Sequence, residues 1–172
     1  GTLMAQGYKI PEQSLNSTAL SGAYVSNTSA ADAAYYNPAN MAFMSSNKHF
    51  ELNAMYIHLN PVEFDGSIGG MESTSASTSE DFIIPQMYLV SARVGEDADI
   101  RVGVSVNAPA GLSKRWPDGL ESLYAEEFSL SVIEVNPSMS YRLMDGLAVA
   151  AGVRFVYSEG VVKAGGPGGL DM

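Results

Sequence analysis

The chain has 172 residues, a formal net charge of −10 and no cysteine. Its length predicts a single domain with enough residues to bury a sizeable core. The absence of cysteine excludes disulfide bonds and cysteine-ligated metal sites. Because proteins that bind nucleic acid normally carry a positive charge, the acidic balance argues against nucleic acid as a partner.

Hydropathy points away from helices that cross a membrane. Hydrophobic residues make up 46% of the chain, yet its mean hydropathy is only +0.02. No run of about 18 apolar residues occurs, so the sequence predicts no transmembrane helix. Strands that cross a membrane are short and alternate apolar with polar residues, which leaves the mean hydropathy near zero. A membrane protein built from strands therefore stays open.

The first residues allow two interpretations. Residues 1–5 end in Ala5 and fit the tail of a secretory signal that is cleaved after a small residue. They contain no basic start and no full apolar run, so the plain beginning of the chain or a cloning remnant fits as well.

Residues 6–46 are rich in Ser, Ala, Asn and Tyr and hold few charges. Short helices are expected at 14–20 and 29–34, but neither has the apolar stripe that marks a core helix. A turn is expected at Asn37-Pro38-Ala39-Asn40, because proline fixes its φ angle and asparagine bonds the local backbone. The segment is therefore not an ordinary helical core.

From Lys48 onward apolar and polar residues alternate, which predicts β-strands. Tight turns are expected at Glu96-Asp97 and at Met144-Asp145-Gly146, where Asp-Gly is a good hairpin signal. The fourth strand shifts its apolar phase near Val132–Ile133, so we expect a β-bulge there. The five expected strands cover residues 48–60, 82–94, 100–108, 128–143 and 147–159, with polar loops at 65–81, 109–127 and 165–169.

Two features of these strands fit an up-and-down barrel in an outer membrane. Long loops follow the first and third strands and tight turns follow the second and fourth, as in barrels whose loops lie at one end and turns at the other. In the third strand Val102, Val104 and Val106 alternate with small or polar residues such as Gly103 and Ser105, which suit a lumen. A soluble β-sandwich would show the same alternation, so the pattern alone leaves both folds open.

Three stretches carry a resemblance to a known family. The first is Gly7-Tyr8-Lys9-Ile10-Pro11-Glu12-Gln13-Ser14, and the second runs from Ala30 to Ala42 with Asp32 and Asn37-Pro38-Ala39. The third is Pro109-Ala110-Gly111-Leu112, followed by Trp116. Together with the order of strands and loops, they resemble over essentially the whole chain the N-terminal portion of the FadL/TodX family. Its members are outer-membrane transporters of long-chain fatty acids and aromatic hydrocarbons.

The resemblance implies an all-β fold, a transmembrane antiparallel up-and-down β-barrel of about fourteen strands that is multi-pass in the bacterial outer membrane and monomeric when full length. Residues 1–46 would form an N-terminal hatch with short helices, and residues 47–172 the first five strands with their loops. Because five strands cannot close a barrel and family members are much longer, we expect further strands after Met172.

The implied function is passive uptake of hydrophobic small molecules, either long-chain fatty acids or aromatic and aliphatic hydrocarbons, with no cofactor. The hatch motif would be Asn37, Pro38 and Ala39. Substrate would leave sideways into outer-membrane lipid through a kink in the third strand. The residues for that lateral opening are Pro109, which has no amide hydrogen, Gly111, which tolerates unusual dihedral angles, and Leu112.

Four side chains are candidate substrate contacts: Tyr35, Tyr36, Trp116 and Lys163. Lys163 lies near the end of the fifth strand, where some fatty-acid transporters have a basic residue for the carboxylate. Structural roles without substrate contact stay open for these residues and for Asn37. The tyrosines could pack the hatch, Asn37 could bond only its own turn, and Trp116 could be an interfacial aromatic residue. A second acidic residue that usually follows Asp32 is Ala33 here, so a neutral hydrocarbon also stays open as substrate.

The remaining polar residues give little support for chemistry. Arg101 and Arg154 face inward by alternation, and we expect them to pair with carboxylates rather than bind ligand. His49 and His58 lack further ligands at suitable spacing, so no metal site is expected. Glu126-Glu127 is read as a solvated acidic pair, and no enzyme is predicted. The alternatives are a surface β-barrel with a structural or adhesive role and no transport, or a soluble secreted β-sandwich that binds a ligand.

Overall fold

The structure, a computed structural model, describes residues 9–45, 47–94, 99–117, 126–164 and 170–171. Its helical elements are α1 (Leu15–Ala19), α2 (Ala33–Tyr36) and the 3₁₀-helix η1 (Pro38–Phe43). Ser14 begins α1, because its side chain accepts a hydrogen bond from the backbone N–H of Ser17. Pro38 begins η1, where the fixed φ of proline fits the first helical position. No helix among the described residues is long and apolar enough to cross a membrane.

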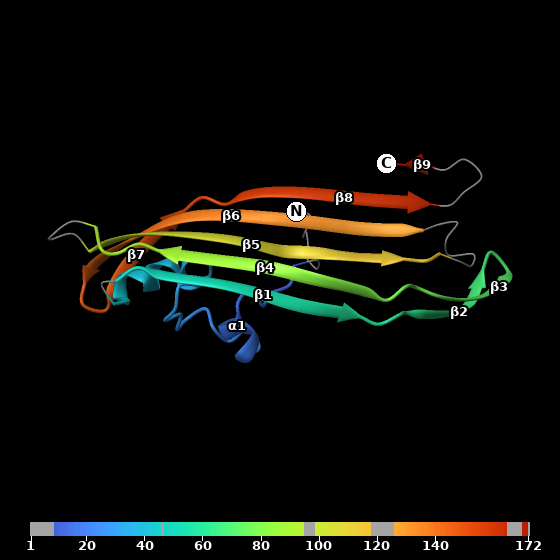
Figure 1. The fold of residues 1–172 in the computed structure, drawn as a ribbon, viewed down its shortest axis with the longest axis horizontal. Coiled ribbons are helices and arrows are strands. Elements are labelled where there is room, and N and C mark those ends of the chain that lie inside the picture. The colour runs from blue at the N-terminus through green and yellow to red at the C-terminus, as the bar shows by residue number, and fades with distance from the viewer. Residues whose placement is uncertain (1–8, 46, 95–98, 118–125, 165–169, 172) are drawn as a thin grey trace, which may run out of the picture. The chain divides into compact units, whose positions relative to one another are not determined.

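The strands of the described residues form two sheets. The larger, seven-stranded sheet has the order β1-β4-β5-β6-β8-β9, with β7 also paired to β6, and the smaller sheet pairs β2 with β3 (Figure 1). The strands are β1 (His49–Leu59), β2 (Glu63–Ile68), β3 (Met71–Ala76), β4 (Glu80–Val90), β5 (Ile100–Arg115), β6 (Glu127–Met144), β7 (Leu147–Gly152), β8 (Phe155–Ala164) and β9 (Leu170–Asp171). The first four expected strands are thus present as β1, β4, β5 and β6.

The expected polar loop at 65–81 is wrong, because most of it is the hairpin β2–β3. Ile68 pairs with Met71 across a two-residue turn of Gly69 and Gly70. Both glycines have positive φ angles, +61° and +85°, which is the conformation that tight hairpin turns require. The serines and threonines of this stretch read as loop residues, yet they tolerate a strand once such a turn is in place.

Two other boundaries differ from the prediction. The expected break at Pro109-Ala110-Gly111 is wrong, since β5 continues through these residues to Arg115. The expected fifth strand is divided into β7 and β8, which are separated by Val153 and Arg154. The Asp145-Gly146 turn is present, and Gly146 has a φ of +82°. The turn expected at Glu96-Asp97 and the loop expected at 165–169 lie outside the described residues.

In β6 the alternation of buried and exposed residues changes phase nearer the start of the strand than predicted. Val132 is buried and Ile133 is exposed, and this alternation continues regularly to Tyr141, so there is no slip at Val132–Ile133. Phe128 is exposed although it is an even number of residues from Val132. The burial phase therefore changes between Ser129 and Leu130, which are both half-buried.

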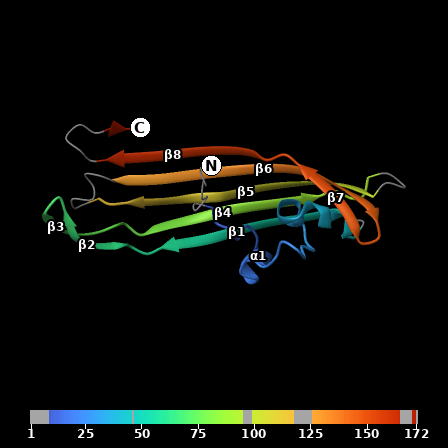
Figure 2. The same cartoon turned by 180° about the vertical axis from the view of Figure 1, so that it is seen from behind.

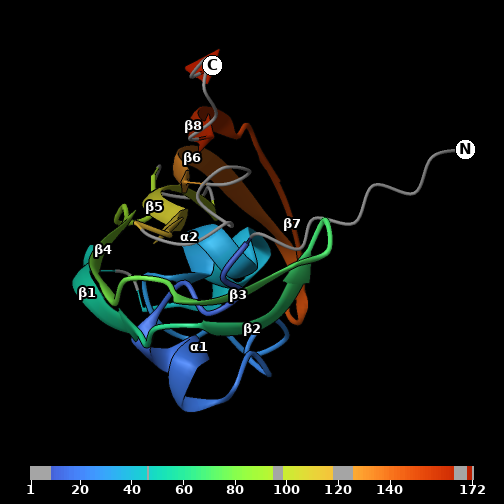
Figure 3. The ribbon, with the colours of Figure 1, turned by 90° about the vertical axis from the view of Figure 1, so that its right-hand side faces the viewer.

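The chain divides into two structural units. The first comprises Gly1–Met55, Ile84–Pro109 and Ile133–Tyr157. Within it the N-terminal segment, residues 9–45, covers one face of the strands, which we call the inner face. Figure 2 shows the helical elements in front of the strands, and Figure 3 shows α2 beside β5 and β6. Small residues allow this close packing, and the core consists of Ala31, Ala33, Ala34, Met41, Met44, Tyr88 and Val90.

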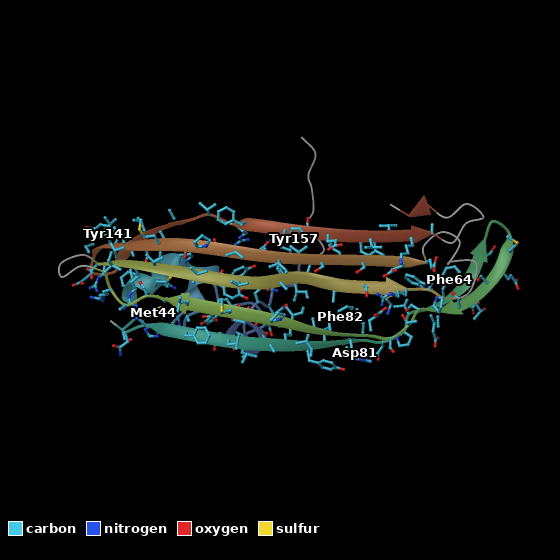
Figure 4. The ribbon with its side chains drawn as sticks, turned by 45° about the horizontal axis from the view of Figure 1, so that its top comes forward. Met44, Phe64, Asp81, Phe82, Tyr141 and Tyr157 are labelled. Carbon is cyan, nitrogen blue, oxygen red and sulfur yellow. The ribbon has the colours of Figure 1, made fainter. Side chains whose placement is uncertain are left out.

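The opposite, outer face of the first unit is apolar and open. Val102 is 43% exposed, whereas Arg101 and Gly103 beside it on β5 are buried. No second sheet covers this face within the described residues of the unit. The prediction that the valines point outward and the small or polar residues inward is therefore confirmed. Other large apolar side chains exposed in this unit are Phe50, Leu52, Leu89, Ile133, Val135, Met139, Val149, and Tyr141 and Tyr157, which are labelled in Figure 4.

The second unit comprises Tyr56–Ile83, Ala110–Val132 and Ser158–Met172. Charged side chains from four strands alternate in sign in this unit. Arg115 lies 2.8 Å from a carboxylate oxygen of Glu80 and 3.1 Å from one of Glu127, and the Lys163 amine lies 2.8 Å from the other oxygen of Glu127. The four strands β4, β5, β6 and β8 are thereby linked by ion pairs.

Candidate functional site

The N-terminal segment is organised around one buried carboxylate. Asp32 is 0% exposed, and its two oxygens accept hydrogen bonds from the Tyr24 hydroxyl at 2.9 Å and the Asn16 amide at 3.2 Å. Burial, followed by the hydrogen bond to Asp32, raises the pKa of Tyr24 to about 12. Tyr24 therefore stays a neutral donor to the buried carboxyl group of Asp32.

The motif Asn37-Pro38-Ala39 forms the joint between α2 and η1. The Asn37 side-chain amide donates to the carbonyl of Val25 at 3.2 Å. Asn40, one turn later, donates to the hydroxyl of Thr28 at 2.9 Å. Both bonds tie the joint to the preceding loop, so the side chain of Asn37 bonds a residue outside its own turn.

The strands of the larger sheet are called the wall from here on. α2 packs against the inner face of the wall at a position where the residue has no side chain. A Cβ atom placed on Gly103 of β5 would lie 2.9 Å from the Cβ of Ala34 and 2.5 Å from the sulfur of Met41. The carbonyl oxygen of Ala34 accepts hydrogen bonds from the Asn136 amide at 3.3 Å and the Ser138 hydroxyl at 3.4 Å, both on β6. This contact requires glycine at position 103, because a side chain there would meet the helix.

A second buried carboxylate joins the N-terminal segment to the wall. Glu134 on β6 is 1% exposed and lies 2.5 Å from the Lys9 amine and 3.5 Å from the Arg154 guanidinium. The same guanidinium stacks 5.1 Å from the centre of the Tyr35 ring. Burial, followed by the nearby charge of Glu134, raises the pKa of Tyr35 to about 12. The predicted pairing of Arg154 with a carboxylate is confirmed.

The matching prediction for Arg101 is wrong. Its guanidinium donates to backbone carbonyl oxygens of Met44, at 3.0 Å, and of Ser45. These carbonyls follow the last turn of η1, where the helix leaves acceptors without partners. Arg101 therefore fixes the end of the N-terminal segment to β5 through the main chain rather than through an acidic side chain.

A concavity of about 520 Å³ lies between the Asn37-Pro38-Ala39 joint and β7, and we call it the inner concavity. Small side chains of β7 form its wall, and Arg154 is the one charged residue in its lining. It brings four of the expected site residues together, since Tyr35 lies beside the joint. The lining residues are Tyr35, Asn37, Pro38, Ala39, Asn136, Ala148, Val149, Ala150, Ala151, Gly152 and Arg154.

Tyr36 does not line this concavity. Its hydroxyl accepts a hydrogen bond from the Gln13 backbone N–H at 2.5 Å and donates to the carbonyl of Pro11 at 3.1 Å. Its ring packs edge-on against Tyr35 and Tyr24, with centroid distances of 5.0 and 5.6 Å. These contacts give Tyr36 a packing role within the N-terminal segment.

The three residues expected at the lateral opening, Pro109, Gly111 and Leu112, do not share one environment. Pro109 is buried, and its carbonyl oxygen accepts a hydrogen bond from the backbone N–H of Ile10 at 2.8 Å. Gly111 and Leu112 follow within β5, in the second unit, and open space surrounds the position of a Cβ atom on Gly111. Pro109 is therefore bonded directly to the N-terminal segment.

The other two expected substrate contacts lie in the second unit. The Trp116 backbone N–H donates to the carbonyl of Glu126 at 2.9 Å, and the Lys163 amine is ion-paired to Glu127. A substrate carboxylate would have to compete with Glu127 for that amine.

Sequence reasoning missed Gly103 and Glu134, which hold the N-terminal segment to the wall. Signals for both exist in hindsight. Gly103 is an isolated glycine in a clean strand pattern, which marks a close backbone approach. Glu134 is an acidic residue among apolar strand residues, so it faces inward and needs a cation.

Comparison with known proteins places the chain among outer-membrane proteins. It matches, over residues 1–168, the model of the family described as outer membrane protein transport protein (OMPP1/FadL/TodX). It is 26% identical over 181 residues to outer membrane protein P1 of Haemophilus influenzae, which covers 95% of this chain and 38% of that protein. The chain thus spans well under half the length of this relative.

A solved structure has the same fold. The crystal structure of a Pseudomonas aeruginosa FadL homologue aligns with a TM-score of 0.58 and 23% identity, over 77% of this chain and 33% of that one. The exposed apolar face and the antiparallel strands thus form part of a multi-pass outer-membrane β-barrel. The resemblance seen in Asp32, Asn37-Pro38-Ala39 and Pro109-Ala110-Gly111-Leu112 is confirmed, and the chain belongs to the OMPP1/FadL/TodX family of outer membrane transport proteins.

Proposed function

We propose that this protein is a passive channel that takes up hydrophobic small molecules, either long-chain fatty acids or aromatic and aliphatic hydrocarbons, across the outer membrane. The observation that carries the proposal is the inner concavity, which lies beside the family motif Asn37-Pro38-Ala39 in a chain of a transport family. Its β7 wall consists of Ala148 to Gly152, whose mostly small side chains leave room for a passing molecule.

Residues 1–46 act in this proposal as the hatch of the lumen, and residues 47–172 as the first strands of its wall. The contacts of Ala34 with Gly103 and Asn136 and the ion pair of Lys9 with Glu134 support a seated hatch. Transfer of apolar surface from water into the lumen supplies the driving force, so neither a cofactor nor a covalent step is needed. We further propose that the protein works as a monomer and is not an enzyme.

The lateral exit through β5 is part of the same proposal. Pro109 cannot donate a hydrogen bond to a neighbouring strand, and its carbonyl is used by Ile10 of the hatch. Movement of the hatch would therefore release the wall at Pro109, with Gly111 and Leu112 next to it. Interrupted pairing is tolerated in a membrane only where other protein groups or a cavity meet the backbone, which the hatch provides.

The charge of the substrate determines which side chains matter. A fatty-acid carboxylate would meet Arg154 in the inner concavity or Lys163 in the second unit, and each now pairs with a glutamate. A neutral hydrocarbon would leave both ion pairs intact. Tyr35 in the concavity and Trp116 offer aromatic surface to either class.

The proposal is tested by uptake in cells that lack their own transporter of this kind and express the protein. A labelled long-chain fatty acid and a labelled neutral hydrocarbon are supplied separately. Ala39→Phe should lower uptake, because its ring would fill the inner concavity. Ala54→Phe, on an exposed position of β1, is the matched control and should transport normally.

Absence of uptake of both compounds, with the protein folded in the membrane, would support the second candidate, a structural or adhesive barrel without transport. Uptake that is unchanged by Ala39→Phe would remove the inner concavity from the path.

A further inference from the structure

A second place in the wall, away from Pro109, combines a broken strand with a proline. β7 ends at Gly152 and β8 begins at Phe155, and both pair with β6. The last partners of β6 and β7 are Ser138 and Gly152, and the next bond runs from the Val153 N–H to the carbonyl of Pro137 at 3.0 Å. Pro137 has no N–H to return that bond, so the ladder between the strands is incomplete here.

The wall is also thin at this place. Ser138 and Ser140 of β6 are buried, so their partners Gly152 and Ala150 share the inner face, and Ala151 lies on the outer face. Gly152 adds no side chain on the inner face. A Cβ atom on it would lie 3.0 Å from the carbonyl oxygen of Pro137 and 3.1 Å from the Cβ of Ser138. Gly152 therefore contributes only backbone to this section and Ala151 only a methyl group, with Ser138 of β6 packed beside Gly152.

Concavities lie on both sides of this thin section. The inner concavity includes Ala151 and Gly152 in its lining. A second concavity of about 430 Å³ shares the same two residues, and we call it the outer groove. Its lining is mainly apolar and comes from β5, β6, the end of β7 and the residue after it. The lining residues are Val102, Pro137, Ser138, Met139, Ala151, Gly152 and Val153.

From this arrangement we propose that the wall opens between β6 and the break that separates β7 from β8, and that the outer groove receives the hydrocarbon part of the transported molecule. The inference rests on the proposed transport function and adds a second exit to the one at Pro109. The incomplete ladder lowers the number of hydrogen bonds that must part, and the apolar groove accepts a chain without desolvating charge.

The occupant follows from the shared residues. Because Ala151 and Gly152 line both concavities, a molecule in the inner concavity is already in contact with the section that separates it from the groove. A lipid chain from the bilayer would reach the groove only from outside and would not depend on the inner concavity. The two sources therefore respond differently when the inner concavity is blocked.

The first experiment closes the break reversibly in the whole protein. Met139 and Ala151 are cross-strand partners, and Met139→Cys with Ala151→Cys would allow a disulfide that holds β6 to β7. The chain has no cysteine of its own, so only the introduced pair can oxidise. The matched control is Leu89→Cys with Val104→Cys, partners on β4 and β5 with side chains toward the outer face.

We expect oxidation to lower uptake in the Met139/Ala151 variant, with the remaining uptake passing the exit at Pro109, and reduction to restore it, while the Leu89/Val104 variant transports equally in both states. Equal uptake by the oxidised and reduced Met139/Ala151 variant would overturn the second exit while transport itself stands. Failure of both reduced variants and of the unmodified protein to transport would instead reject the proposed function.

The second experiment identifies the occupant. A long-chain alkyl probe with a photoreactive diazirine is added from outside, and labelled residues are located by mass spectrometry. We expect labelling of Met139 and Val153, and loss of that labelling in the Ala39→Phe variant, in which the inner concavity is filled. Labelling that persists in Ala39→Phe would mean that chains enter the groove from the bilayer, and the proposed occupant would be wrong.

Discussion

Ala34 of α2 lies directly on the backbone of Gly103 in β5, so close that a Cβ atom on Gly103 would be 2.9 Å from the Cβ of Ala34. Two carbon atoms that are not bonded need a larger separation, so the N-terminal segment packs this closely on β5 only because position 103 has no side chain. The Ala34 carbonyl meanwhile accepts bonds from Asn136 and Ser138. One residue of the hatch is thus held by two neighbouring strands.

Gly103→Ala is expected to loosen the hatch. The added methyl group would clash with Ala34 and with the buried Met41, and overpacking of this kind costs about 1–3 kcal/mol. The N-terminal segment should become more sensitive to limited proteolysis, and the thermal midpoint should fall.

Gly111→Ala is the matched control on the same strand. Nothing lies within 4 Å of a Cβ atom on Gly111, so its stability should equal that of the unmodified protein. Equal proteolysis of both variants would show that the hatch does not depend on the close approach at Gly103.

Glu134→Gln is expected to release Lys9 from β6 and to lower stability. The substitution removes the carboxylate from Lys9 and Arg154 and leaves both cations without that partner. Loss of one member of a fully buried ion pair costs roughly 3–5 kcal/mol, and we expect about 2 kcal/mol here because both cations retain contact with solvent. Chemical denaturation in detergent measures the change.

Asp145→Asn tests whether any lost ion pair has this effect. Asp145 pairs with Arg142, but its side chain is 96% exposed, so no measurable loss of stability is expected. If the two variants are equally stable, Glu134 does not anchor the hatch.

Stability should decline at high pH in a way that depends on Tyr24. The unfolded tyrosine titrates near pH 10, and in the folded chain burial and the hydrogen bond to Asp32 raise the pKa of Tyr24 to about 12. Because the folded pKa is the higher one, the contribution of Tyr24 is fully present below about pH 10 and is lost between about pH 10 and 12.

The measurement compares the unmodified protein with Tyr24→Phe. The variant lacks the bond to Asp32 and should be less stable at neutral pH, and the difference should shrink as the pH rises from about 10 to 12. A difference that stays constant across this range would exclude a raised pKa at Tyr24.

Replacing Pro109 and Gly111 together by valine tests the exit through β5. Valine at 109 would restore a backbone N–H, and both valines favour a regular strand, so the wall would be harder to open. Uptake should fall while the barrel remains folded, as judged by heat-modifiable migration on gels. Unchanged uptake by the double variant would count against this exit and leave the break at Val153 and Arg154 as the remaining one.

Local pattern was sufficient for much of the wall. The alternation in β5 follows from the two-residue period of a strand, so the outward direction of Val102 and the inward direction of Gly103 could be predicted without any neighbour. The same pattern could not separate a barrel from a sandwich. The stretches around Asp32 and Asn37 made that distinction, because they resemble an outer-membrane family whose model the chain matches.

Predictions failed where distant residues decide the outcome. Proline was expected to end the third strand, yet Pro109 stays within β5, and its carbonyl has a partner in Ile10, which lies far away in the sequence. Local composition does not reveal such a partner. The error over 65–81 had a local cause instead, since the Gly69-Gly70 pair that supplies the turn is itself visible in the sequence.

The sequence by itself determined where β1, β4, β5 and β6 lie, which side of them is apolar, and that a polar, small-residue segment precedes them, because these depend on period and composition over a few neighbouring residues. Only the tertiary structure decided that Lys9 meets Glu134, 125 positions away, and that Ala34 rests on Gly103. It also placed two concavities on either side of Ala151 and Gly152. The physical reason is that ion pairs, close packing and wall thickness are properties of segments brought together in space, and no local pattern contains them.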